Sequence, residues 1–287
     1  MIIGSYELDA RARTSEHIAE VQCDIGRSFS RYYESFDQPR GMAAHRLERG
    51  LVDFAEEQEI YTEFLNTDNL QEYSYDPNAF KRAMKSDCPI VRHCLHSPAT
   101  VMDNYRRAFF SMAGADMLRV TSNIVTFAHE YSGSFSETAH FAARSPSDFG
   151  VQELDTEPFT AFGAIGGGIR SLFLHFLYPN IFPSRSQNAI WALYFLTNKK
   201  SYGLPDESEF LMVKEHGAQQ NYFYPYDLFT YYARAIYLML RKTMHEDRRK
   251  LDESCRYVYV DCFLNHVAFV HRDEINDLKP PNERFDY

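Results

Sequence analysis

The chain of 287 residues contains no run of about 18 uninterrupted apolar residues, which is the length that a membrane-spanning helix requires. Its first residues, MIIGSYELDARAR, also lack the charged start and the long apolar centre of a signal peptide. We therefore expect a cytoplasmic protein without membrane contact.

Cysteine and tryptophan are scarce, with five Cys and one Trp. An odd number of thiols in a chain without an export signal indicates reduced cysteines. The spacing of Cys88 and Cys94 is wider than the Cys-x2–4-Cys pairs of structural zinc sites, so buried free thiols are the favoured interpretation.

Several catalytic motifs are absent from the sequence. It has no P-loop, no glycine fingerprint for dinucleotides, no Gly-x-Ser-x-Gly elbow and no His-Glu-x-x-His. The common enzyme classes that these motifs identify are therefore disfavoured, and no cofactor is predicted.

Positive charge is in deficit, because 30 Lys and Arg face 40 Asp and Glu, for a formal net charge of −10. Such a balance repels the phosphate backbone of nucleic acids, so a nucleic-acid role would need a local basic face. The short basic runs, such as Arg106-Arg107 and Lys199-Lys200, are typical of solvated helix ends.

Apolar and aromatic residues are plentiful, at 45% and 15% of the chain. Apolar residues recur every three or four positions over several stretches, which predicts helices at about 14–35, 43–65, 105–131, 227–244 and 256–270. Thr14 or Ser15 is the predicted cap of the first. Asp116 falls within the apolar stripe of the third. The last of these stretches is ambiguous, because its β-branched and aromatic residues also suit a strand, but a helix is favoured. The sequence thus predicts an all-α, compact multi-helix protein of one or two lobes, with at most a small β contribution, near Tyr257–Val260.

Two irregular stretches interrupt the helical pattern. Residues 132–158 are rich in Ser, Gly, Asp and Pro and could link an N-terminal lobe, 1–131, to a C-terminal lobe, 159–287, or form a loop within one domain. Residues 197–225 are also irregular, with one short helix predicted over Glu207–Glu215.

A glycine cluster precedes an apolar helix in the segment 162–196, FGAIGGGIRSLFLHFLYPNIFPSRSQNAIWALYFL. Amides at a glycine-rich helix start can bind an anion, so Gly166, Gly167, Gly168 and Arg170 form a candidate anion or nucleic-acid site. The alternative is that the glycines only let the helix start pack closely against a neighbour.

In the same segment, Ala164-Ile165-Gly166 lead into the apolar helix, and residues 178–183 (YPNIFP) lead to a second helix with Ser184 or Ser186 as its cap. This order resembles the hairpin region of the helix-hairpin-helix DNA glycosylase superfamily, in which hairpin amides bind duplex phosphate and an aspartate before the next helix is catalytic. Here Ser184, Arg185 and Ser186 stand in place of that aspartate, and no lysine lies near the hairpin. The resemblance implies a helical scaffold with anion contact, without glycosylase activity.

The pair Glu137 and His140 has the Glu-x-x-His spacing of helical metal sites, and Asp116, His129 and Glu130 could complete a carboxylate and imidazole group. Because only one such pair occurs, a structural or surface role is the favoured interpretation.

Three functions remain open from the sequence. The first is a nucleic-acid-associated protein that uses the glycine segment. The second is a helical enzyme with a site around Asp116, Glu137 and His140. The third is a structural or regulatory module that binds a protein partner. The sequence leaves the oligomeric state open.

Overall fold

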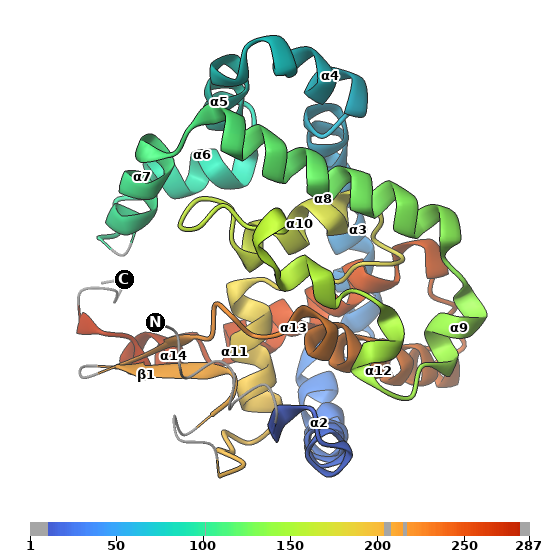
Figure 1. The fold of residues 1–287 in the computed structure, drawn as a ribbon. Coiled ribbons are helices and arrows are strands. Elements are labelled where there is room, and N and C mark those ends of the chain that lie inside the picture. The colour runs from blue at the N-terminus through green and yellow to red at the C-terminus, as the bar shows by residue number, and fades with distance from the viewer. Residues whose placement is uncertain (1–10, 101, 204–207, 215–216, 282–287) are drawn as a thin grey trace.

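Helices dominate the computed structural model, which describes residues 11–100, 102–203, 208–214 and 217–281 (Figure 1). The predicted all-α class is confirmed. The first half of the chain forms α2 (Ser15–Phe36), α3 (Met42–Phe64), α4 (Thr67–Glu72), η1 (Tyr73–Tyr75), α5 (Pro77–Ser86), α6 (Pro89–His96), α7 (Met102–Ser111) and α8 (Gly114–Ser134).

The second half combines longer helices with short 3-10 helices and one hairpin. Its elements are α9 (Glu137–Ala142), η2 (Pro146–Phe149), η3 (Gln152–Asp155), η4 (Glu157–Phe159), α10 (Gly167–Leu177), α11 (Gln187–Leu196), β1 (Leu211–Lys214), β2 (Gly217–Gln220), α12 (Tyr226–Glu246), η5 (Glu253–Cys255), α13 (Arg256–Val270) and α14 (Arg272–Leu278).

Helix starts follow the capping residues that the sequence contains. Thr14 Oγ1 accepts a hydrogen bond from the His17 amide at 3.3 Å, and Ser186 Oγ accepts one from the Ala189 amide at 3.1 Å. Each side chain satisfies an amide that has no partner within its helix. The predicted starts of α2 and α11 are therefore confirmed.

Helix α3 runs along the molecule, behind α10 and α13 in Figure 1, and packs against both. The close approach of α3 to α13 depends on Gly50, because a Cβ at this position would lie 2.1 Å from Cys262 Sγ. The glycine therefore sets how near the two helices come.

Aromatic rings fill much of the hydrophobic core, which joins residues from both halves of the chain. Tyr61 of α3 stacks on Phe176 of α10 with 4.1 Å between ring centroids. Trp191 of α11 is 1% exposed, and its ring meets Tyr194 edge-on at 6.1 Å. Rings thus contribute to the core at helix contacts, as the composition indicated.

The single long helix predicted over 105–131 is wrong, because α7 ends at Ser111 and α8 begins at Gly114. The start of α8 packs tightly on the start of α5: a Cβ at Gly114 would lie 2.3 Å from the Pro77 carbonyl oxygen. This tertiary contact sets the direction of α8, and nothing in the local helical periodicity signals it.

The helix predicted over Glu207–Glu215 is also wrong in its described part. β1 and β2 form an antiparallel hairpin in which Leu211 lies opposite Gln220. Glu207 and Glu215 themselves lie outside the described residues. The hairpin supplies the small β contribution, whereas Tyr257–Val260 belongs to α13.

The segment 132–158 contains the end of α8, then α9, η2, η3 and the start of η4. Within the described ranges, no helix is both long enough and apolar enough to cross a membrane.

Candidate functional site

The glycine segment begins with a tight turn that rests against α7. Ala161 and Ile165 form an isolated antiparallel bridge, and Gly163 between them has φ of 83°. A Cβ at Gly163 would also lie 2.5 Å from Ala108 Cβ. Glycine is therefore required here both by the backbone angle and by the neighbouring helix.

The first residue of α10, Gly167, is covered by an arginine. A Cβ at Gly167 would lie 1.4 Å from Arg185 Nη2, so the glycine makes room for this guanidinium. Arg185 is 4% exposed and donates to the carbonyl oxygens of Tyr222, at 3.0 Å, and Tyr224. Burial lowers the pKa of Arg185 to about 10. The packing interpretation thus explains Gly167.

Arg170, the cation of the predicted anion site, is buried within the fold. It forms an ion pair with Asp155 and donates to Thr160 Oγ1 at 3.0 Å. Asp155 also accepts from the Tyr226 amide at 2.7 Å, at the start of α12. Arg170 therefore ties α10 to η3 and α12.

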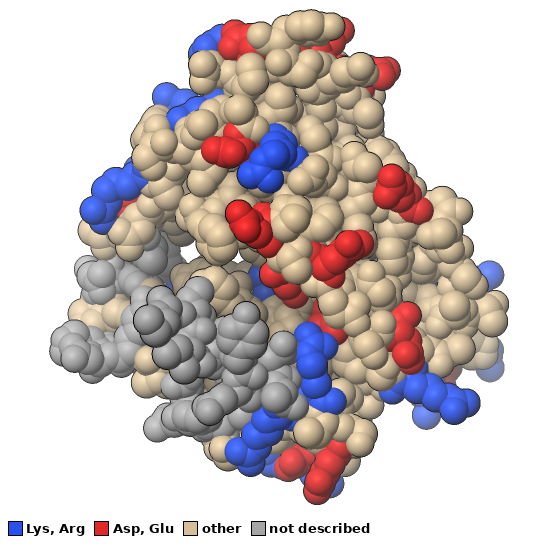
Figure 2. All heavy atoms as spheres, viewed as in Figure 1, with Lys and Arg blue, Asp and Glu red and all other residues tan. Residues whose placement is uncertain are grey.

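The predicted anion site then rests on backbone amides, chiefly at the exposed Gly168. Figure 2 shows Asp and Glu side chains gathered at the centre of this face, where Figure 1 draws α10 and the segment before it. The 3-10 helices of that segment contribute Asp148, Glu153, Asp155 and Glu157. Anion binding at Gly166, Gly167 and Gly168 stays a prediction.

Glu137 and His140 both have partners inside the protein. Glu137 forms an ion pair with Arg256, and His140 Nε2 lies 2.8 Å from the Tyr257 hydroxyl. Burial lowers the pKa of His140 to about 3, and the charges of Arg256 and Arg234 act in the same direction. Among the described residues, no group of three His, Cys, Asp or Glu is placed to hold a metal ion.

Asp116 is not buried in an apolar stripe as predicted, because its side chain is 57% exposed and pairs with Arg119 at 3.4 Å. It lies in the first turn of α8, whereas Glu137 and His140 follow the last turn. At about 1.5 Å of rise per residue, the end of α8 that leads to them lies roughly 27 Å from Asp116. The structure does not bring these residues together.

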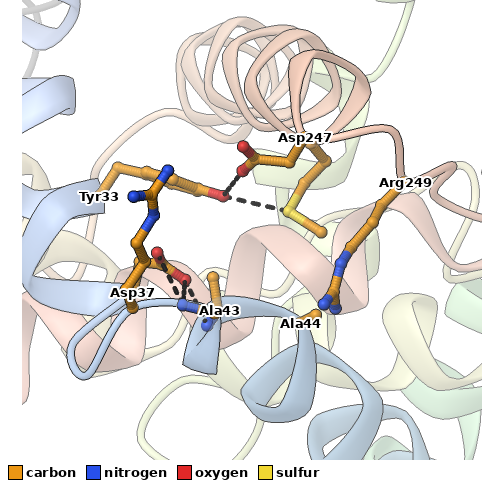
Figure 3. Close-up of a pocket in the computed structure, with 9 residues that line it drawn as sticks. Tyr33, Asp37, Ala43, Ala44, Asp247 and Arg249 are labelled. Carbon is orange, nitrogen blue, oxygen red and sulfur yellow. Dashed lines mark hydrogen bonds between the residues drawn. The ribbon is translucent and has the colours of Figure 1, made fainter.

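A small pocket of about 170 Å³ lies beside the end of α2 (Figure 3). Two of its polar side chains already have partners: Asp37 accepts hydrogen bonds from the amides of Gly41 and Ala43, and the Tyr33 hydroxyl donates to Met244 Sδ at 3.1 Å. The pocket is below the 300–1,000 Å³ typical of ligand sites. Its polar contacts stabilise the turn into α3.

A much larger groove, of about 810 Å³, lies between α3, α10 and α13. We call it the α3–α13 groove. Its lining includes Phe36, His45, Arg46, Arg49, Asp53, Phe54, Glu57, Leu172, His175, Phe176, Ser184, Asp261, Cys262, Asn265, His266 and Phe269. Its volume lies within the range of small-molecule sites.

Two buried side chains that line this groove each have a polar atom without a hydrogen-bond partner among the described residues; we call these the open polar atoms. His175 is 3% exposed, and its Nδ1 donates to the Phe182 carbonyl oxygen at 2.8 Å, which leaves Nε2 as an acceptor. Burial lowers the pKa of His175 to about 4, so the ring is neutral at pH 7. No described residue bonds to His175 Nε2 or to Oγ of Ser184, which is 5% exposed.

Asp261 is the most perturbed carboxyl of the groove. Asn265 Nδ2 donates to it at 2.9 Å, and Asn188 Nδ2 donates to Asn265 Oδ1 at 3.0 Å. Burial raises the pKa of Asp261 to about 7; the bond from Asn265 opposes this increase, and the charge of Glu57 adds to it. Asp261 therefore changes from hydrogen-bond donor to acceptor near neutral pH.

His266 lines the groove near the end of α13 and connects three helices. Arg46 Nη1 donates to His266 Nδ1 at 3.0 Å, so Nε2 carries the proton and donates to Ser35 Oγ at 3.0 Å. Burial and the charge of Arg46 lower the pKa of His266 to about 4. This neutral ring joins the ends of α2, α3 and α13.

The sequence did not identify Asp261, His175 or Ser184 as site residues. One signal was present, because Asp261 and Asn265 stand four residues apart in a segment that is otherwise largely apolar. The groove itself joins residues from about 36 to 269, and no local pattern connects them.

No protein family model, no curated protein and no solved structure matches this chain.

Proposed function

We propose that the protein binds a small organic molecule in the α3–α13 groove. The observation that carries the proposal is the combination of about 810 Å³ of open volume with the open polar atoms of His175 and Ser184. Binding sites of this kind are mostly apolar and carry a few polar groups that fix the orientation of the ligand. Phe54, Phe176 and Leu172 supply the apolar walls here.

The groove can also hold or move a proton. Asp261 is able to donate below pH 7, and neutral His175 is able to accept. A carboxyl and an imidazole of this kind are the groups that general acid and base catalysis uses. An enzymatic role would therefore use these residues, and not the predicted group of Asp116, Glu137 and His140.

The test is a fragment screen by NMR on the full chain, with cationic, neutral and anionic compounds. We expect hits that shift the amide signals of α3, α10 and α13. Phe269→Ala removes an exposed ring from the groove and should weaken these hits about tenfold. The matched control is Phe223→Ala, because both rings are 61% exposed and Phe223 lies outside the groove lining. A screen without hits, or hits that Phe269→Ala leaves unchanged, would contradict the proposal.

Nucleic-acid association through Gly166, Gly167 and Gly168 is kept as a second proposal, supported by the exposure of Gly168 at the start of α10. The acidic face around it and the ion pair of Arg170 reduce its support.

The free thiols Cys23, Cys88, Cys94, Cys255 and Cys262 support a cytoplasmic, reducing compartment.

A further inference from the structure

The charges that line the α3–α13 groove do not balance. On α3, Arg49 pairs with Asp53 at 2.8 Å. Arg46 donates hydrogen bonds to His266 Nδ1 and to the Gln38 carbonyl oxygen, and its guanidinium lies 5.6 Å from the centroid of the Phe36 ring. The basic groups of the groove wall therefore already have partners.

Two carboxyls of the groove lack a cation. Across the residues that the structure describes, neither Glu57 on α3 nor Asp261 on α13 forms an ion pair with Lys, Arg or His. The two lie close enough for the charge of Glu57 to raise the pKa of Asp261. Two facing helices thus present adjacent, uncompensated negative charge to the same open volume.

Aromatic rings adjoin this acidic part of the groove. Phe54 lies one helical turn before Glu57, and its ring stacks on Phe176 with 5.0 Å between centroids. Phe269 stands at the edge of the groove with 61% of its surface exposed. The Arg272 guanidinium already lies 4.9 Å from the Phe269 ring centroid. The rings therefore offer the ligand apolar surface to bury.

Resting on the ligand-binding function proposed above, we propose that the ligand is an organic amine with an apolar or aromatic body. Its ammonium group lies between Glu57 and Asp261, and its body lies against Phe54, Phe176 and Phe269. A carboxylate or phosphate ligand would meet two negative charges. A bare metal ion would leave the aromatic walls uncovered.

Binding should depend on pH. The ionisable or charged groups that line the groove with Asp261 are His45, Arg46, Arg49, Asp53 and Glu57 from α3, His175 from α10, and Cys262 and His266 from α13. His45 pairs with Glu48 at 3.6 Å. His175 and His266 remain neutral above pH 5, and burial raises the pKa of Cys262 to about 12. Asp261, with a pKa raised to about 7, is thus a carboxyl of the groove whose charge changes between pH 6 and pH 8.

The experiment uses three probes of the same shape, 2-phenylethylamine, 2-phenylethanol and 3-phenylpropanoate, titrated into the full chain by NMR. We expect the amine to bind at least tenfold more tightly than the other two, with amide shifts on α3, α10 and α13. Its affinity should rise between pH 6 and pH 8, because Asp261 loses its proton while the amine keeps its charge.

Variants distinguish the effect of the two groove carboxyls on amine binding from the effect of other acidic residues on α3. Glu57→Gln and Asp261→Asn should each weaken the amine about fivefold or more. Glu59→Gln, an exposed neighbour on α3 outside the lining, should leave affinity unchanged. Loss of the rise in affinity above pH 6 in Asp261→Asn, with the fold intact by amide spectra, would identify the charge as the cause.

Tighter binding of the alcohol or the propanoate in the groove would overturn the amine assignment and leave ligand binding intact. The same holds if the amine fails while other fragments bind the groove. Absence of any ligand in the groove across the full screen would overturn both proposals.

Discussion

Gly50 is the residue on which the contact of α3 with α13 depends. We expect Gly50→Ala to lower the free energy of unfolding by about 1–3 kcal/mol, because its Cβ would lie 2.1 Å from Cys262 Sγ. Cys262→Ala removes that sulfur, so the alanine at position 50 should be tolerated in the double variant. Urea unfolding of the two single variants and the double variant measures the coupling.

If the clash is the cause, the double variant is more stable than the sum of the single effects predicts. Additive effects would show that the helices do not meet at this pair. Alanine also favours a helix interior over glycine by up to about 1 kcal/mol, so relief of the clash could leave the double variant close to the native protein.

Asp261 should make stability depend on pH near neutrality. Its folded pKa of about 7 lies above the unfolded value near 4, so the folded state binds the proton first. Its contribution to stability is therefore fully present below about pH 4 and is lost as the pH rises to about 7. Asp261→Asn, which cannot ionise, should be more stable than the native protein at pH 8.

The informative quantity is the difference in unfolding free energy between Asp261→Asn and the native protein, measured by urea at several pH values. We expect this difference to shift in favour of the variant between pH 4 and pH 7. Two parallel curves would mean that Asp261 has an ordinary pKa.

Individual side chains of the groove were hard to predict because each has an ordinary local setting in the sequence. His175 occupies a position on an apolar helix, where a histidine most often packs in the core, and it does pack there. Only the structure shows that Nδ1 donates to the Phe182 carbonyl oxygen, which leaves Nε2 as an acceptor without a partner among the residues that the structure describes. By contrast, the interpretation that a glycine lets the start of this helix pack closely needed only local reasoning, and it holds for Gly167.

The start of α10 offers a way to separate packing from anion binding. Gly167→Ala should destabilise the protein by about 2 kcal/mol or more, since its Cβ would collide with the Arg185 guanidinium. Gly168 has only the Arg185 carbonyl oxygen near, at 3.9 Å. Gly168→Glu should therefore fold normally, with its charge favourable at the start of a helix.

If the α10 amides bind phosphate, Gly168→Glu abolishes salt-dependent binding of duplex DNA while thermal unfolding stays unchanged. Equal binding by Gly168→Glu and the native protein would exclude the site. Arg170→Glu is the less useful variant, because it breaks the buried ion pair with Asp155.

Helix boundaries could be predicted where a side chain caps the helix. They could not be predicted where a tertiary contact determines the position at which a helix begins or ends. Thr14 and Ser186 are caps that the sequence displays. The break between α7 and α8 depends on the contact of Gly114 with Pro77, 37 residues earlier in the chain. The strands β1 and β2 have only four residues each, too few to show an alternating pattern.

Buried or half-buried neutral histidines distributed through the fold should make the protein sensitive to acid. His140, His175 and His266 have pKa values lowered to about 3, 4 and 4, mainly by burial. The unfolded chain binds these protons near pH 6.5, before the folded state does. Stability is therefore full above about pH 6.5 and is lost as the pH falls toward 4.

His175 alone should account for about 3 kcal/mol of this loss, at about 1.4 kcal/mol per pKa unit. His175→Asn keeps a donor for the Phe182 carbonyl oxygen and removes the titration. The unfolding free energy of the variant should fall less between pH 6.5 and pH 4 than that of the native protein. An unchanged slope would show that the pKa of His175 is the same in the folded and unfolded states.

The overall class was predictable because composition and helical periodicity act over the whole chain, and the 3.6-residue pattern survives in α2, α3, α12 and α13. The groove could not be predicted from the sequence, because it forms where α3, α10 and α13 meet and these helices are far apart in the chain. The excess of acidic residues was known from the sequence. That two of them, Glu57 and Asp261, share one open volume required the fold.

The burial of Trp191 gives the protein an internal optical reporter. It is the only tryptophan of the chain, it is 1% exposed, and it does not line the α3–α13 groove. Its fluorescence should emit at short wavelength in the folded state and shift to longer wavelength when the core around α11 opens. Ligands in the groove should leave this emission nearly unchanged, so one intrinsic signal measures unfolding separately from binding.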